Sequence, residues 1–491
     1  MRRSASALLL ALLVASCGYD GTEVAPPGVA PGIVNGSRLR ARVYAMEGGS
    51  HVFRGWYDPI IGTACTFALA SDGALRCLPS NDVAQVEVVF ADEDCTHALA
   101  ANRRVCAPVP AFLREETPSH RCDFATIAAP LVTRSKHVFP DQMSVVYTKN
   151  IHGSCLAHGA HSLVEDYYDA DPMDPKVFVA GTLGGMDAHG SRLVESTITG
   201  DDGSQQGAGM FDTERHEACA SLATMLGRGT DLCIPEMAWG TDRYFSDSKC
   251  HVRVAYQAKL MQSCPKAGIG VDELGEPDAT FFSPGDEVSI TTIYSTALGP
   301  RCASLRSSPS VFNQDKLDHA FYELGAPIAA SVFAPLTTKQ VGKGRLVSAF
   351  HATPGGDLLD RSAPSWSFTD NGAGAACELV RFGDGRLRCI SDFATFFDSA
   401  AIYGDDACTH PVIVISSGSP TYAVRSAEAC GPPWLATGIY SIGEELTGPS
   451  FVHAGGAASC TARTAYAGEH AHEFGAPVAL SVFATVFETV E

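Results

Sequence analysis

Basic residues are scarce in this 491-residue chain. It has 35 Lys and Arg against 55 Asp and Glu, so its formal net charge is −20. Proteins that hold DNA or RNA use Lys and Arg to displace counterions from phosphates, and anionic lipid attracts the same residues. We therefore expect no nucleic-acid partner and no direct electrostatic adhesion to a membrane. The acidity favours solubility.

Short catalytic motifs are also lacking. The sequence has no HExxH, GxSxG, Walker A or acid-followed GxGxxG pattern, and those patterns carry zinc, serine-nucleophile, phosphate and dinucleotide chemistry. We expect no catalytic residue and no cofactor. Paired carboxylates of a glycan hydrolase stay open as an alternative, because 55 acidic residues can hide them.

Long apolar runs are missing after the first residues, so no segment is expected to span a membrane. Residues 1–16 have the charged start and short apolar stretch of a signal peptide. Val14-Ala15-Ser16-Cys17 resembles a bacterial lipobox, which predicts lipidation of Cys17. The alternative is a plain secretory signal cut near Ala15. Residues 17–36 are rich in Pro and Gly and are predicted to form a tether.

What the sequence does contain is a repeat of about 150 residues, present three times. Each copy opens with Arg-Leu, at Arg38, Arg192 and Arg345. The predicted copies are residues 37–187, 188–342 and 343–491. Each copy also has a turn glycine, an aspartate shortly before a cysteine, and an aromatic-x-Asp-x-x-Cys pattern. The aspartates shortly before a cysteine are Asp58, Asp212 and Asp370. Those of the aromatic-x-Asp-x-x-Cys pattern are Asp92, Asp247 and Asp405.

Seventeen cysteines in an exported chain indicate disulfides. Five align in each copy, and the first two lie on neighbouring predicted strands of one hairpin. We therefore predict that the first pairs with the second, while the sequence leaves the other pairings open. The predicted bridges are Cys65–Cys77, Cys219–Cys233 and Cys377–Cys389.

Short alternating runs rich in Val, Phe and Tyr, separated by Gly, Asp and Pro, predict an all-β fold. Three copies of eight to eleven strands favour a β-propeller, with six blades as the simplest count. The alternative is three tandem β-sandwiches. One short helix is predicted over residues 313–324.

The runs GWYD, DGALRCLPS and FADEDC resemble repeats of uncharacterised, often lipidated, cell-envelope proteins of myxobacteria. The resemblance covers most of residues 37–491. It departs in the middle copy, where GTDLC replaces the DG-x-L-R-C pattern. It implies a location in the cell envelope and implies no activity.

The candidate site residues each have a structural alternative. Asp58, Asp212 and Asp370 are suited to lining a pore or binding calcium, but capping of a turn is the interpretation that we favour. The same preference holds for Asp92, Asp247 and Asp405. Asp169, Asp171 and Asp174 resemble part of a calcium loop, and we favour an acidic turn there. His470 and His472 would share one face of a strand as half a metal site, and we favour exposed histidines in a loop.

The sequence thus predicts a lipid-anchored binding or interaction scaffold for an unknown protein or glycan ligand. A glycan-active hydrolase and a purely structural envelope protein are the alternatives. Gly18 follows Cys17 where an inner-membrane retention aspartate would stand. The predicted location is therefore the outer membrane.

Overall fold

The computed structural model has an all-β fold, which confirms the predicted fold class. It describes residues 32–491 except for 48, 81–82, 86–87, 104–111, 115, 118–126, 129–131, 139–144, 150–154, 160–164, 185–191, 222–230, 236–243, 259–280, 289–291, 296–301, 305–318, 360–367, 398–400, 416–418, 427–434, 454–459 and 464–468. In these residues the helical elements are single 3₁₀ turns, namely η1 (Pro175–Val177), η4 (Ala330–Val332) and η6 (Leu480–Val482). None of the helices in this part of the chain is long and apolar enough to cross a membrane.

The first copy begins with four antiparallel strands joined by short turns, and a fifth strand returns to them much later in the chain. The alternating, β-branched sequence of these segments suits a strand with one buried face. In order of pairing the strands are β1 (Arg40–Met46), β2 (His51–Asp58), β3 (Thr63–Leu69), β4 (Leu75–Pro79) and β15 (Ala180–Gly184).

The second and third copies repeat this pairing order. The second has β16 (Leu193–Gly200), β17 (Gln205–Asp212), β18 (Glu217–Ser221), β19 (Leu232–Pro235) and the closing pair β26 (Ala334–Pro335) and β27 (Thr337–Val341). The third has β28 (Leu346–Ala352), β29 (Phe368–Asp370), β30 (Ala375–Phe382), β31 (Leu387–Ile390) and β40 (Ala484–Val490). We call these strands of all three copies the hub.

Each closing strand also pairs with the first strand of another copy. Strand β15 pairs with β16, β27 with β28, and β40 with β1. Neither a propeller nor a closed barrel is found among the described strands. The physical reason is that closing strands divide their hydrogen bonds between two copies, so the hub does not separate into independent blades. The pairing of β1 with β40 also brings the first and third copies into contact.

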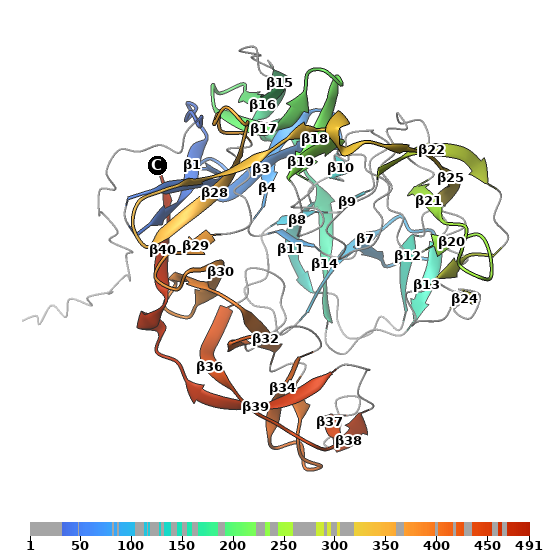
Figure 1. Ribbon diagram of the computed structural model, residues 1–491, viewed down its shortest axis with the longest axis vertical. Helices are drawn as coiled ribbons and strands as arrows, with labels where there is room; N and C mark the ends of the chain where they lie inside the picture. The colour runs from blue at the N-terminus through green and yellow to red at the C-terminus, as the bar shows by residue number, and fades with distance from the viewer. Residues whose placement is uncertain are drawn as a thin grey trace, which may run out of the picture.

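The remaining strands of each copy form a lobe inserted between the fourth and the closing hub strand (Figure 1). Lobe 1 is an eight-stranded sheet made of β5 (Val83–Gln85), β6 (Val88–Phe90), β7 (Ala98–Arg103), β8 (Phe112–Arg114), β11 (Val132–Val138), β12 (Val146–Lys149), β13 (Cys155–Gly159) and β14 (Glu165–Pro172). Two short strands, β9 (Glu116–Thr117) and β10 (Ile127–Ala128), pair with each other, and β10 pairs with β3.

Lobes 2 and 3 share the main strand pairings of lobe 1. Lobe 2 has β20 (Tyr244–Phe245), β21 (Val254–Ala258), β22 (Phe281–Val288), β23 (Tyr294–Ser295), β24 (Ala303–Ser304) and β25 (His319–Ile328). Lobe 3, in the lower part of Figure 1, has β32 (Phe393–Phe397), β33 (Ile402–Tyr403), β34 (Pro411–Ile415), β35 (Tyr422–Ser426), β36 (Leu435–Glu445), β37 (Ser450–His453), β38 (Cys460–Arg463) and β39 (His470–Pro477).

The helix predicted over residues 313–324 is wrong where the structure describes it. Residues from His319 onward belong to β25, which pairs with both β21 and β22. Ala320 and Tyr322 are buried in one apolar cluster, and Phe321 is buried in another. Packing on both faces of a strand outweighs the weak helical propensity of this segment.

Disulfides staple the hub and the lobes at equivalent places. The predicted hub bridges Cys65–Cys77, Cys219–Cys233 and Cys377–Cys389 are all present. Three more bridges, which the sequence had left open, join the third and fifth cysteines of each copy within the lobes. They are Cys95–Cys155, Cys250–Cys302 and Cys408–Cys460. Disulfides of this kind fit an exported protein in an oxidising compartment.

Candidate functional site

The first repeated polar feature is a salt bridge between the opening arginine of each copy and its shared aspartate. Arg38 Nε and Nη2 donate to the two carboxylate oxygens of Asp58 at 2.9 and 2.6 Å. Arg345 does the same to Asp370, at 2.8 Å for both bonds. The third pair is Arg192 and Asp212, with Nη2 to Oδ2 at 2.6 Å. This forked geometry is the strong form of the arginine–carboxylate interaction.

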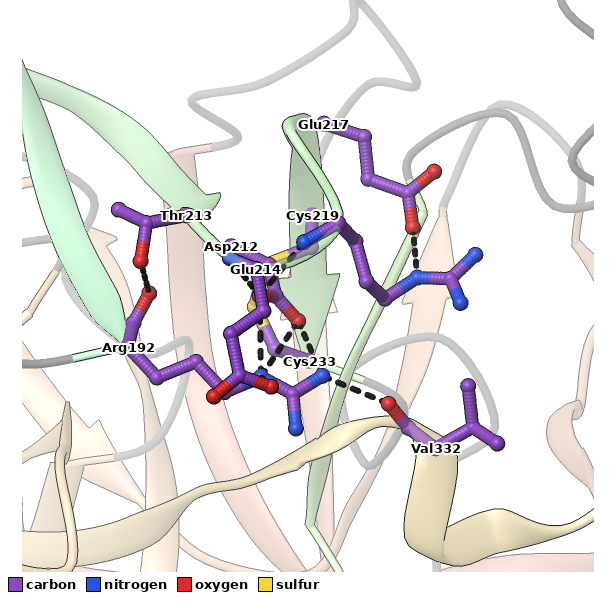
Figure 2. A network of polar contacts seen from close by, with 9 residues as sticks. Arg192, Asp212, Thr213, Glu214, Glu217, Cys219, Cys233 and Val332 are labelled. Atoms are coloured by element: carbon purple, nitrogen blue, oxygen red, sulfur yellow. Dashed lines mark hydrogen bonds and ion pairs between the residues drawn. A yellow bond between two sulfur atoms is a disulfide. The ribbon is translucent and has the colours of Figure 1, made fainter.

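The same arginines also hold the end of their own copy. Arg192 Nη2 donates to the carbonyl oxygen of Val332 in η4 at 2.6 Å, as Figure 2 shows. Arg38 and Arg345 make the equivalent bonds to Val177 in η1 and Val482 in η6. We call each group of arginine, aspartate and valine carbonyl a clamp. A clamp joins the first strand, the turn after the second strand and the chain segment returning from the lobe.

The clamp aspartates also cap their turns. Asp212 Oδ1 accepts from the backbone N–H of Glu214 at 3.0 Å, and Asp370 Oδ1 from that of Gly372 at 2.9 Å. Asp58 Oδ1 accepts from Ile60 at 3.0 Å. These aspartates therefore cap turns in the structure, which is the interpretation favoured from the sequence. Their oxygens are engaged by arginine and backbone donors, which leaves a calcium or pore-lining role without support.

Burial and charge act against each other in the clamps. The Asp370 side chain is 3% exposed. Burial alone would raise the pKa of its carboxyl. The Arg345 guanidinium and the turn N–H groups lower that pKa by more than burial raises it, so it lies below its ordinary value. The pKa of Arg345 is raised by its bond to Asp370. Both partners are thus held in their charged forms, as a structural ion pair requires.

The second repeated feature is an exposed loop around the aromatic-x-Asp-x-x-Cys pattern. We call residues 92–97, 247–252 and 405–410 the cysteine loops. The Asp92 carboxylate accepts from the N–H groups of Thr96 and His97, at 2.9 and 2.6 Å. Asp247 and Asp405 accept equivalent bonds from His251, Val252, Thr409 and His410. Capping was the favoured interpretation here as well.

Each cysteine loop is also fixed by its cysteine. Cys95, Cys250 and Cys408 have φ values of 52°, 53° and 51°, a left-handed conformation that costs energy in residues other than glycine. Each forms the lobe disulfide, whose second sulfur contacts the carbonyl oxygen of the loop aspartate. An exposed loop is therefore held in one shape three times by a bridge and a carboxylate.

Acid is expected to loosen the cysteine loops. The pKa of Asp92 lies below its ordinary 3.8, chiefly because of the Thr96 N–H. That of Asp247 is lowered chiefly by the Val252 N–H, and that of Asp405 by the Thr409 hydroxyl. A depressed carboxyl pKa stabilises the fold fully above the ordinary value, and this contribution is lost as pH falls through the folded value.

Hydrogen exchange between pH 6 and pH 2, corrected for intrinsic rates, should therefore show protection of these loop amides falling below about pH 4. The variant Asp92→Asn should flatten the profile in the first loop alone, and Asp94→Asn should leave it unchanged. A profile that is flat in all three loops of the wild type would contradict this assignment.

The remaining predicted positions form no shared site in the structure. Asp169 and Asp171 belong to strand β14, so the acidic turn predicted there is wrong. Their backbones pair with Leu99 and Thr133, and this pairing keeps the segment extended. Asp174 caps η1 by accepting from the Lys176 N–H at 3.0 Å. Among the described residues no group of three or more His, Cys, Asp or Glu could hold a metal.

Both histidines lie on strand β39, so the loop predicted for them is wrong, because this segment pairs with β34 and β36. His470 is exposed, as favoured, and has an acidic partner, whereas His472 is half-buried. His470 Nδ1 lies 2.7 Å from Glu445 Oε1, and both side chains are more than half exposed. His472 Nδ1 lies 3.4 Å from the Gly443 carbonyl oxygen. Cys17, the predicted lipidation site, lies outside the described residues, as do residues 17–31 of the tether.

The comparison with known families decides the classification. The profile of a family of unknown function, DUF7481, matches residues 9–320 and again residues 309–489. The chain belongs to the DUF7481 family. The first match covers the first copy and most of the second, and the second match begins near the end of the second copy and covers nearly all of the third. No curated protein and no solved structure matches the chain. Membership of DUF7481 therefore brings no activity with it.

From the sequence, the opening arginines mark the copies and the aspartates are candidate site residues, but the pairing of the two was not predicted. A signal was present, since an arginine precedes a buried aspartate by a similar distance in every copy. The arginine precedes the first strand and the aspartate ends the second, and the spacing alone does not show that these two strands place them side by side.

Proposed function

We propose that the protein is an exported, lipid-anchored binding scaffold of the cell envelope, which presents its lobes to a protein or glycan ligand. The observation that carries the proposal is the set of three cysteine loops. An exposed loop gains nothing for the hydrophobic core, yet each copy devotes a disulfide and several hydrogen bonds to fixing it. Fixed exposed loops on a rigid framework suit recognition, because little conformational entropy is lost on binding.

The hub supports this proposal by supplying the framework. The clamps tie the returning end of every lobe to the hub, and the hub disulfides lie among its buried side chains. The loops differ in charge: Glu93 and Asp94 in the first, Lys249 in the second and Asp406 in the third. One backbone shape with three sets of side chains is suited to contacting one ligand at several places.

Binding is tested with the whole exported protein on arrays of glycans and peptides. The control is the double variant Cys95→Ser/Cys155→Ser, which frees one loop and leaves the hub bridges intact. A ligand that binds the wild type at least tenfold more tightly than the variant would support the proposal. Equal binding by both would mean that the first cysteine loop is not part of the binding surface. If neither array yields a ligand, the result counts against recognition of glycans and peptides.

Anchoring is predicted to depend on Cys17. The variant Cys17→Ser should move the protein from the membrane fraction to the soluble exported fraction, because a lipidated cysteine with several acyl chains gives firm anchoring. Labelled palmitate should enter the wild type and not the variant. The control Cys106→Ser should remain in the membrane fraction. If the wild type takes up no label, then the anchor is absent and the protein is exported without it.

A further inference from the structure

The strand register allows the three contacts between copies to be compared position by position. On the closing strands, Gly181, Leu336 and Val486 are equivalent, and they lie opposite Leu75, Asp231 and Leu387 of the same copies. On the first strand of the adjoining copy, the equivalent residues are Ile198, His351 and Tyr44. The third equivalent set, opposite the second hub cysteine, is Phe67, Ser221 and Leu379.

Two of the three contacts are apolar at these positions. Between the first and second copies, Phe67 and Ile198 both lie over Gly181, where an added Cβ would be 2.8 and 3.0 Å from them. Between the third and first copies, Tyr44 and Leu379 pack against a cluster that contains Leu387 and Val486. Burial of apolar area at these positions depends little on pH. The contact between the third and first copies also contains an imidazole–carboxylate pair elsewhere, His51 and Glu491, so the contact between the first and second copies is the apolar reference.

The contact between the second and third copies is polar at the same positions. Ser221 Oγ donates to Asp231 Oδ1 at 2.6 Å, and His351 Nδ1 lies 3.0 Å from Asp231 Oδ2. The side chains of Asp231 and His351 are only 12% and 11% exposed, and Ser221 is buried. His351 belongs to the third copy and the other two to the second. At these three positions, the boundary between the second and third copies thus carries a largely buried imidazole–carboxylate contact, and the other two boundaries carry apolar side chains.

We propose that this contact is a pH-sensitive joint between the second and third copies. Histidine is the side chain whose charge ordinarily changes between pH 5 and 8. When His351 is protonated, its bond to the Asp231 carboxylate is charge-assisted on both sides, and such bonds are about twice as strong as neutral ones. When it is neutral, the imidazole no longer adds its own charge to the bond with Asp231, and the contact is weaker.

Among the described residues of the strands around His351, the charged group facing it is Asp231. Lys339 on β27 donates to the Gly356 carbonyl oxygen instead, and Asp357 Oδ2 accepts from the Thr353 hydroxyl of its own turn at 3.5 Å. The joint is therefore tightest at mildly acidic pH and loosens as pH rises. Below the range in which Asp231 is ionised, the gain disappears again.

Hydrogen exchange on the whole protein at pH 5.5 and pH 8.0, corrected for intrinsic rates, tests the joint. We expect protection of β27 and β28 to fall about tenfold at the higher pH. Protection of β16, which lies at the apolar contact between the first and second copies, should change far less. An equal change at β16 would overturn the proposal, because it would reflect the whole fold.

Two variants separate the joint from general stability. The triple change Ser221→Leu/Asp231→Leu/His351→Tyr installs the residues found between the third and first copies and should abolish the pH dependence at β27 and β28. The single change His351→Gln should do so as well, and it serves if the triple variant does not fold. His470→Asn removes an exposed histidine and should leave the dependence intact. Persistence of the dependence in His351→Gln would refute the role of this histidine.

Discussion

Replacing Asp212 by alanine is expected to lower the free energy of unfolding by about 3 kcal/mol. The carboxylate is 1% exposed and balances Arg192, whose side chain is 24% exposed. The alanine variant leaves the guanidinium partly buried without that partner, and the turn N–H groups of Glu214 and Arg215 lose their acceptor. Removing one partner of a buried ion pair destabilises a fold strongly, because the other charge stays buried without compensation. The intact pair, by contrast, adds little stability over apolar side chains at the same place. Urea denaturation measures the change.

Two variants of the same network serve as controls. Asp212→Asn keeps an oxygen for the turn and loses the charge, so its effect should be smaller, about 1–2 kcal/mol. Glu214 lies 3.3 Å from Arg192 but is 68% exposed, and Glu214→Gln should cost less than about 0.5 kcal/mol. A stability of Asp212→Ala close to that of Glu214→Gln would mean that the clamp does not hold the copy together.

Local features of this fold were within reach of the sequence, because each depends on neighbours along the chain. The hub bridge Cys65–Cys77 joins adjacent strands of one hairpin, so the spacing of the two cysteines was sufficient. The capping role of Asp92 depends on N–H groups within five residues. The strands themselves follow from alternation and turn residues.

Features that depend on the path between distant strands were out of reach. The lobe bridge Cys95–Cys155 spans 60 residues, and nothing in the spacing selects it over other pairings. The propeller was expected because the number of strands in each copy suggested separate blades. In the structure β15, the closing pair of β26 and β27, and β40 each serve two copies, and the length of a strand does not tell how its hydrogen bonds are shared.

The division of each copy into hub and lobe explains what the clamps do. The lobe is inserted between β4 and β15 in the first copy, and likewise in the others. The returning chain must therefore be placed beside a strand that left the hub about a hundred residues earlier. Arg38 does this by bonding to both Asp58 and the Val177 carbonyl. A change in a lobe can then leave the hub intact, which suits the proposed scaffold.

The second large effect is expected at β40, the strand that joins the third copy to the first. Val486 is fully buried, in a cluster that combines Met46 and Val52 of the first copy with Leu346 and Leu387 of the third. Placing a charge there, as in Val486→Asp, should lower the free energy of unfolding by more than about 4 kcal/mol. Urea denaturation gives the size of the effect. Limited proteolysis in urea, with the fragments identified by mass spectrometry, gives its location.

The location is the informative part, because β40 serves two copies. Besides its backbone pairing with β1, Glu488 forms salt bridges with Arg42 of the first copy and Arg381 of the third. Cleavage in Val486→Asp should therefore appear in β1 and in β31 at the same denaturant concentration. Phe487→Asp is the matched control, since Phe487 is 47% exposed on the neighbouring position, and it should leave both strands protected. Cleavage confined to the third copy in Val486→Asp would mean that the copies fold independently, and that the contact between β1 and β40 adds little to stability.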